Sequence, residues 1–114
     1  MIDRQVLRDL LQKWQRGEMS VKEVHEAAEE LWEKGAPPEY DENDPRSIAA
    51  EVLMQLDMMH VQWITLEDVP AILAFLDTPP GQDMAGWAEW GRYWDNIDWD
   101  ARKKQLADDR FYLT

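Results

Sequence analysis

The hydrophobic pattern of the chain centres on residues 48–63. Wound as a helix, this segment leaves one narrow polar stripe, made by Glu51, Gln55 and Gln62, and apolar side chains occupy most of the remaining circumference. A helix that is apolar on most sides has to be covered from several directions. We therefore expect this segment to form the buried centre of an all-α domain.

The pattern before this centre predicts a helical hairpin over residues 3–35. Apolar residues recur at helical spacing on both sides of Gly17, and a glycine just past the last periodic residue is a typical helix stop. Ser20 and Glu23 form a capping box that begins the second helix. Residues 36–43 carry paired prolines and three carboxylates, so we expect an exposed linker there.

The remainder of the chain predicts further helices, separated by proline and glycine. Asp44 and Pro45 are typical of an N-cap and a first helical residue, which places the central helix at 44–62. A second capping box and an amphipathic pattern predict a short helix over 65–77. Trp-rich C-terminal helices are expected over 83–109. The prediction is one all-α domain spanning the chain, a compact bundle of five or six helices.

The composition limits what the domain needs in order to fold. A chain of 114 residues buries enough surface to be stable without a metal or a disulfide. The absence of cysteine excludes disulfides, thiolate metal sites and cysteine nucleophiles. No apolar run reaches membrane-spanning length and the N-terminus lacks an apolar signal region, so we expect a cytoplasmic protein.

The net charge of −12 limits the kinds of partner more strongly than any other feature of the sequence. It disfavours nucleic acid, because phosphates would be repelled by most of the surface. No Lys or Arg occurs between Arg46 and Arg92, and this interval contains the carboxylates of Glu51, Asp57, Glu67, Asp68, Asp77, Asp83 and Glu89. Uncompensated acid in the middle of the chain is either a solvated surface or one that attracts a cationic partner.

Asp57 is expected to lie away from bulk water. On the central helix it falls about 140° from the middle of the polar stripe, among apolar residues. A buried carboxylate needs a partner, and His60, three residues on, is within reach. Two interpretations stay open: a structural contact, with His60 or with an aromatic residue or Arg92 of the C-terminal segment, or the polar centre of a site.

Catalytic machinery is not visible in the sequence. Ser20 and Ser47 are the only serines, and both occupy expected helix starts. His25 with Glu29, and the Asp–His pair just described, have helical spacing that a two-helix metal site could use. However, no His-Glu-x-x-His or Glu-x-x-His motif and no glycine-rich phosphate loop is present. We therefore predict a protein that is not an enzyme and has no cofactor or metal.

Seven tryptophans are far more than a chain of this length usually carries. Trp87, Trp90 and Trp94 recur at spacings of three and four, which places three indoles on one helical face. Gly86 and Gly91 each weaken that helix by about 1 kcal/mol unless a close backbone contact makes them useful. The face serves as core packing, as a partner surface or as an aromatic ligand groove.

The N-terminal hairpin, VLRDLLQKWQRGEMSVKEVHEAAEELW, resembles the opening of small helical bacteriocin-immunity proteins of the colicin D immunity type. In that family an apolar helix runs into a short polar break, and a Ser or Thr with Glu three residues later starts the next helix. The resemblance covers about the first 35 residues. It implies a tight complex with a cationic nuclease-type toxin, and no individual functional residue is carried over.

We accordingly predict a non-enzymatic acidic binding protein, of the immunity or inhibitor type, that binds a basic protein through carboxylates and aromatic anchors. The residues expected to contact the partner are Glu51, Asp57, His60, Glu67, Asp68, Trp87, Trp90 and Trp94. No membrane association is expected, and the protein is a monomer or a homodimer. Two alternatives stay open: a small-molecule binder whose groove is lined by the three indoles, with Asp57 or His60 as polar contact, and a self-associating structural protein.

Overall fold

The computed structural model describes residues 4–34 and 47–113, and these residues form helices and connecting turns only. The elements are α1 (Arg4–Gln15), α2 (Val21–Lys34), α3 (Ile48–Asp57), α4 (Met59–Gln62), the 3-10 helix η1 (Leu66–Asp68), α5 (Val69–Leu76), α6 (Asp83–Asp95) and α7 (Trp99–Leu106). The predicted all-α bundle is confirmed. The expected linker 36–43 and the expected cap at Asp44 lie outside the described residues.

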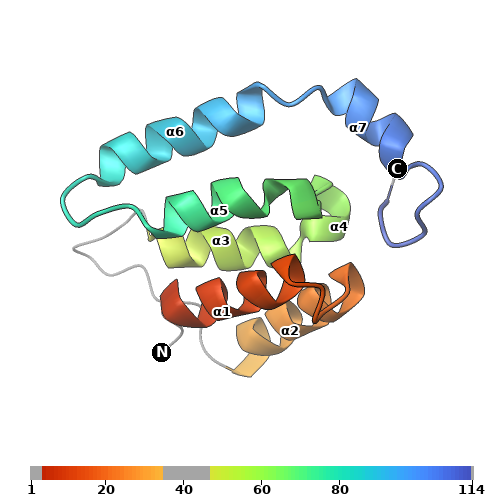
Figure 1. The fold of residues 1–114 in the computed structure, drawn as a ribbon, viewed down its shortest axis with the longest axis horizontal. Coiled ribbons are helices and arrows are strands. Elements are labelled where there is room, and N and C mark those ends of the chain that lie inside the picture. The colour runs from red at the N-terminus through yellow and green to blue at the C-terminus, as the bar shows by residue number, and fades with distance from the viewer. Residues whose placement is uncertain (1–3, 35–46, 114) are drawn as a thin grey trace.

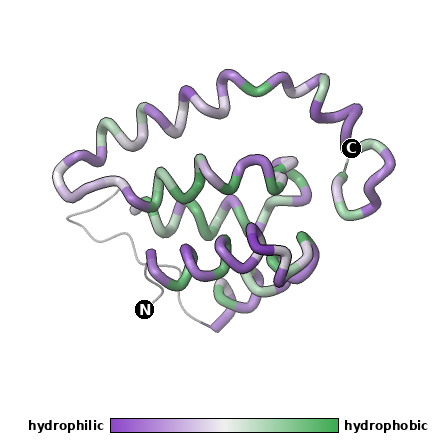
Figure 2. The backbone as a smooth tube through the Cα atoms, viewed as in Figure 1, coloured by the Kyte–Doolittle hydropathy of each residue, from purple (hydrophilic) through white to green (hydrophobic). Residues whose placement is uncertain are grey.

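The helices are arranged in three tiers around α3 and α5 (Figure 1). The α1–α2 hairpin covers one side of α3, α5 covers another, and α6 lies across the outer side of α5 before the chain turns into α7. Figure 2 shows the hydrophobic positions concentrated on α3 and α5. The fully buried large side chains come mainly from these two helices and the inner face of the hairpin: Leu7, Leu11, Val24, Ile48, Val52, Leu53, Leu56, Met59, Ile64, Val69, Ile72 and Leu76.

The central segment is shorter and less enclosed than its hydrophobic pattern predicts. Ser47 caps α3 by accepting a hydrogen bond from the Ala50 amide, and the helix ends where the backbone of Met58 leaves helical geometry, at φ −109° and ψ 18°. The chain resumes as the single turn α4, so the expected helix 44–62 is two helices. Although α1, α2 and α5 pack against α3, part of its apolar surface, including Met54, stays exposed.

The seam between α5 and α6 is aromatic. The ring of Trp90 stacks on Phe75 with centroids 4.3 Å apart, and Trp87 meets Phe75 edge-on at 5.0 Å. Gly86 permits this approach, because a Cβ at that position would lie 2.4 Å from the Thr78 hydroxyl oxygen. Of the two glycines in α6, Gly86 thus has a close contact, with the Thr78 side chain, and Gly91 meets nothing within 4 Å. None of the described helices is long and apolar enough to cross a membrane.

Candidate interaction surface

The sequence interval without Lys or Arg is partly neutralised in the folded protein. Cations from both flanking regions reach three of its carboxylates, and the ion pairs are Asp68 with Arg102, Asp77 with Arg8, and Glu89 with Arg92. The expectation of uncompensated acid is wrong for these three, because linear spacing does not show which distant residues fold onto a segment. Any attraction for a cationic partner has to come from the remaining exposed carboxylates.

Asp68 was expected to contact a partner, and this is wrong because its side chain has no exposed surface. Its two carboxylate oxygens accept hydrogen bonds from both terminal nitrogens of Arg102, at 2.8 and 3.0 Å. The Thr65 amide also donates to it at 2.8 Å, and the Tyr93 hydroxyl donates to it as well. Burial raises the pKa of Tyr93 to about 12, and the bond to the carboxylate adds to that shift. Asp68 therefore joins η1, α6 and α7.

The three tryptophans of α6 face the body of the protein. Trp90 is buried, which excludes it as an anchor for a partner in this structure. Trp94 is half-buried and packs edge-on against Trp90 at 5.2 Å, and Trp87 is half-buried against Phe75. Trp90 therefore has a role in core packing, which is one of the three uses that the sequence left open.

A groove of about 410 Å³ does lie between α5 and α6, but it differs from the predicted aromatic groove. Trp90 is the only tryptophan that lines it, and its other walls include Phe75, Tyr93 and the Thr78 turn. Asp57 and His60 line no part of it. The prediction that Asp57 or His60 supplies a polar contact is therefore wrong for this groove.

The Asp57–His60 pair is not formed. Both side chains are half-buried, and the described residues show no hydrogen bond or ion pair between them. The His60 ring instead lies 4.5 Å from the ring of His25, and its Nδ1 is buried without a partner. His25 contacts Glu29 through Nε2 at 2.9 Å, and Phe111 packs against both imidazoles.

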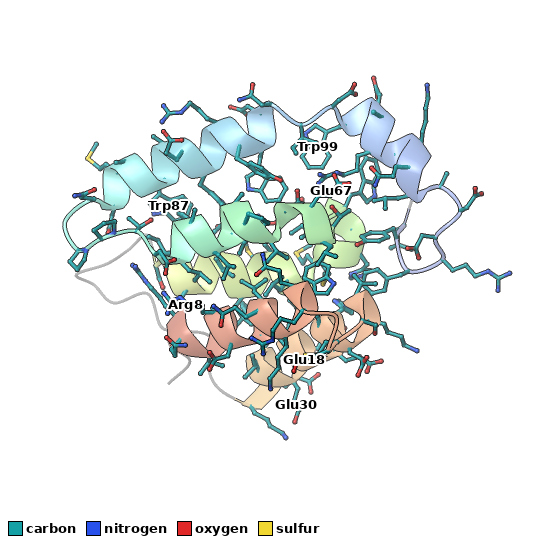
Figure 3. All side chains as sticks on the ribbon, viewed as in Figure 1. Arg8, Glu18, Glu30, Glu67, Trp87 and Trp99 are labelled. Atoms are coloured by element: carbon teal, nitrogen blue, oxygen red, sulfur yellow. The ribbon has the colours of Figure 1, made fainter. Side chains whose placement is uncertain are left out.

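The two remaining predicted contacts have different surroundings. Glu51 is half-buried and accepts a hydrogen bond from Gln55 at 2.9 Å, within the expected polar stripe. Glu67 is exposed at the start of η1. Figure 3 shows Glu67 toward the same end of the long axis as Trp99, with Trp87 toward the other end.

Exposed apolar side chains gather at that end, around α4. We define the α4 surface as Met58, Val61, Trp63, Trp99 and Leu113. Nine large apolar side chains are exposed in the described residues, and four of them (all of this set except Trp63) belong to the α4 surface. The remaining five exposed side chains are scattered, one on each of five different helices. This is therefore where the described residues concentrate exposed apolar area, the feature that marks interaction sites.

The α4 surface is assembled from three parts of the chain. The indole Nε1 of Trp63 donates to the Leu113 carbonyl at 2.7 Å, and the Leu113 amide donates to the His60 carbonyl at 3.0 Å. The rings of Trp63 and Trp99 lie 6.3 Å apart at 51°. A notch of about 170 Å³ opens between these two indoles, Val61 and Gln62.

Carboxylates border this surface. An adjoining groove of about 500 Å³ shares His60 with α4 and is lined by Glu26 and Glu29 of α2. Asp57 lies at the end of α3 and Glu67 follows α4, while two cations, Lys22 and Arg110, also line the groove.

Both serines of the chain have structural roles in the described residues. The two serines are used as helix caps: Ser20 accepts from the Glu23 amide at 3.2 Å, and Ser47 caps α3. The described residues contain no group of three or more His, Asp or Glu side chains that could hold a metal ion.

The contacts predicted from the sequence do not include Val61, Trp63, Trp99 or Leu113. The only available signal was the apolar tail, whose place on α4 depends on hydrogen bonds across some 50 residues of chain. Comparison with known proteins returned no match: no family model, curated protein or solved structure is similar to this chain. The resemblance of the hairpin to immunity proteins therefore stays a prediction.

Proposed function

We propose that this protein is a non-enzymatic binding protein that holds a basic partner protein against the α4 surface. The observation that carries the proposal is the concentration of exposed apolar side chains around α4, bordered by carboxylates, on a chain of net charge −12. Long-range attraction would speed the encounter, and the apolar and aromatic residues at the centre would slow dissociation.

The partner class that fits best is a cationic protein of the toxin or nuclease kind. Support comes from the charge, which opposes that of nucleic-acid-binding proteins, and from the hairpin that resembles immunity proteins. In such a complex the acidic protein covers a basic functional surface. Glu26, Asp57 and Glu67 are the carboxylates that we assign to the rim, in place of the buried Asp68.

Capture from a lysate of the producing organism tests this function. The immobilised protein is expected to retain a basic protein at low salt and to release much of it at high salt, because exposed charges are screened. Replacing Val61 and Leu113 with serine should abolish retention. Met84→Ser is the matched control, since Met84 is the most exposed apolar side chain described, at 78%, and lies on α6.

A pair of charge reversals tests the rim separately. Glu26→Lys with Glu67→Lys should weaken capture, and Glu33→Lys with Asp9→Lys, which changes the net charge equally at exposed positions elsewhere, should not. Equal effects of the two pairs would show that only net charge matters. Retention that survives the double serine variant would refute the α4 surface as the contact.

The groove between α5 and α6 supports a second candidate function, the binding of a small apolar molecule. Its volume of about 410 Å³ falls in the range of roughly 300–1,000 Å³ that is typical of such sites. Ligand binding there would change the emission of Trp90 saturably. A fluorescence screen with aromatic metabolites, repeated on Ala74→Trp to fill the groove, distinguishes this function from protein binding.

A further inference from the structure

The notch on the α4 surface has the dimensions of a site for one side chain. Its volume of about 170 Å³ is below the range of roughly 300–1,000 Å³ typical of small-molecule sites. Val61, Gln62, Trp63 and Trp99 line it, so its walls are two indoles, one aliphatic group and one amide, with no cation among them. The occupant therefore meets aromatic surface and a neutral hydrogen-bonding group.

Trp63 adopts a backbone conformation that favours glycine. It follows the last residue of α4 at φ 57° and ψ 45°, and the Ile64 amide bonds back to the Met59 carbonyl at 3.1 Å. Helices that end in this way usually have glycine at the left-handed position, because an L side chain is disfavoured there. The other two described residues with positive φ are Gly17 and Gly81. A tryptophan at this left-handed position is unusual, and the cost of its backbone conformation suggests that its side chain has a function there.

The indole is fixed in place at both its ring and its backbone. Its Nε1 donates to the Leu113 carbonyl at 2.7 Å, and Arg102 donates to the Trp63 carbonyl at 3.1 Å. Trp99 begins α7, whose N-cap Asp98 accepts from the Ala101 amide at 3.0 Å. The two rings are thus held 6.3 Å apart and tilted by 51° before any partner arrives.

The charge and chemistry of these walls favour a guanidinium group. Indoles attract cations, arginine stacks on them more readily than lysine does, and its weak hydration suits a partly enclosed site. Arg102 provides an internal example, because its guanidinium carbon lies 5.5 Å from the centre of the Trp99 ring. The side-chain carbonyl oxygen of Gln62 can accept a hydrogen bond from one of the five N–H groups of a guanidinium. The exposed carboxylates of Asp98 and Asp100 flank Trp99 in the chain.

We infer that this notch receives an arginine side chain of the basic partner, an inference that rests on the proposed function. The Trp63 and Trp99 rings contact the guanidinium and the stem, Val61 packs against the stem, and Gln62 accepts a hydrogen bond. The unusual backbone of Trp63 is the conformational cost of placing an aromatic wall at the end of α4.

The test uses N-acetyl-arginine amide as the probe and the indole ¹⁵N signals of the tryptophans as the readout. Assigned by single Trp→Phe variants, the signals of Trp63 and Trp99 should shift saturably, whereas those of Trp32 and Trp87 stay still. N-acetyl-norleucine amide, which has a stem but no charge, should bind roughly two- to fivefold more weakly, the worth of an exposed cation–π contact. Equal binding of the two probes, or equal shifts at all four indoles, would overturn the inference.

Two variants separate binding from folding. Trp63→Gly suits the left-handed backbone and removes one wall, so the Trp99 signal should no longer respond to the arginine probe while thermal unfolding remains cooperative. Gln62→Met keeps the volume of an exposed side chain and removes the acceptor, so affinity for the probe should fall without a change in stability. Unchanged probe affinity in both variants would refute the site.

The outcome is independent of the lysate capture. If a basic protein is captured through the α4 surface and the arginine probe shifts no indole, the inference fails and the proposed function stands. If the probe binds in the notch and no basic protein is captured, the arginine site stands and the proposed function fails.

Discussion

Replacing Arg102 with methionine would leave the Asp68 carboxylate buried without its cation. The side chain of Asp68 is fully buried and that of Arg102 is 6% exposed, and two hydrogen bonds of 2.8 and 3.0 Å join them. Removing one member of such a pair costs about 3–5 kcal/mol, because the remaining charge is uncompensated in a poorly solvated site. The same variant also removes the hydrogen bond from Arg102 to the Trp63 carbonyl.

That loss is a large part of the roughly 5–15 kcal/mol by which domains are stable. With a fall in melting temperature of roughly 4 °C per kcal/mol, a loss of 3 kcal/mol lowers the midpoint by about 12 °C. Guanidinium unfolding followed by circular dichroism measures the free energy directly. Lys103→Met is the matched control, since Lys103 is the exposed neighbour on the same helix, and it should change stability by less than about 0.5 kcal/mol.

A double-mutant cycle identifies the cause. Asp68→Asn removes the charge and keeps an acceptor for the Thr65 amide, so adding it to Arg102→Met should cost less than the sum of the two single changes, by about 1–3 kcal/mol. A loss below about 1 kcal/mol for Arg102→Met, or strict additivity in the cycle, would refute the view that this ion pair is a buried and coupled element.

Three further predictions follow from the fold. Gly86→Ala should destabilise the protein by about 1–3 kcal/mol, because its Cβ would lie 2.4 Å from the Thr78 hydroxyl oxygen. Gly91→Ala, which meets nothing within 4 Å, should stabilise it by up to about 1 kcal/mol, and chemical denaturation of both variants tests the contrast. Ser47→Ala should cost about 1 kcal/mol by removing the cap of α3, measured in the same way; an unchanged midpoint would contradict the cap. Burial raises the pKa of Tyr93 to about 12, so the folded state holds this proton more tightly than the unfolded chain. The resulting stability is complete below about pH 10 and falls as the pH rises from there to 12, a loss that Tyr93→Phe should remove and that unfolding curves across this range would detect.

Local signals in the sequence predicted several helix starts and stops. The Ser20–Glu23 capping box is present, with reciprocal bonds of 3.1 and 3.2 Å, and Gly17 takes the positive φ expected of a helix stop. These features depend on residues within one turn of each other, so their spacing is enough to reveal them. The same is true of the second capping box, in which the Thr65 amide donates to Asp68.

Long-range pairing was not predictable in this way. Asp68 illustrates the difference. Its local role as a capping residue was predictable from the sequence, whereas its ion pair with Arg102, 34 residues away, was not. The sequence around Met58 contains no glycine or proline that would indicate a helix break there. Since that break creates α4, the sequence did not reveal the surface around α4 either. Of the predicted contacts, Asp57, His60, Glu67 and Asp68 lie close to α4 in the chain.

The last described residues join the α4 surface to the body of the protein, because Tyr112 is buried and Phe111 packs against the hydrophobic core. The Tyr112 hydroxyl donates to the Ile64 carbonyl at 2.5 Å, and Leu113 bonds to both His60 and Trp63. Removing residues 112–113 would therefore take away a buried aromatic side chain together with the Leu113 side of the contact surface. A change that loosens these two residues would thus alter the stability of the fold and the shape of the contact surface together.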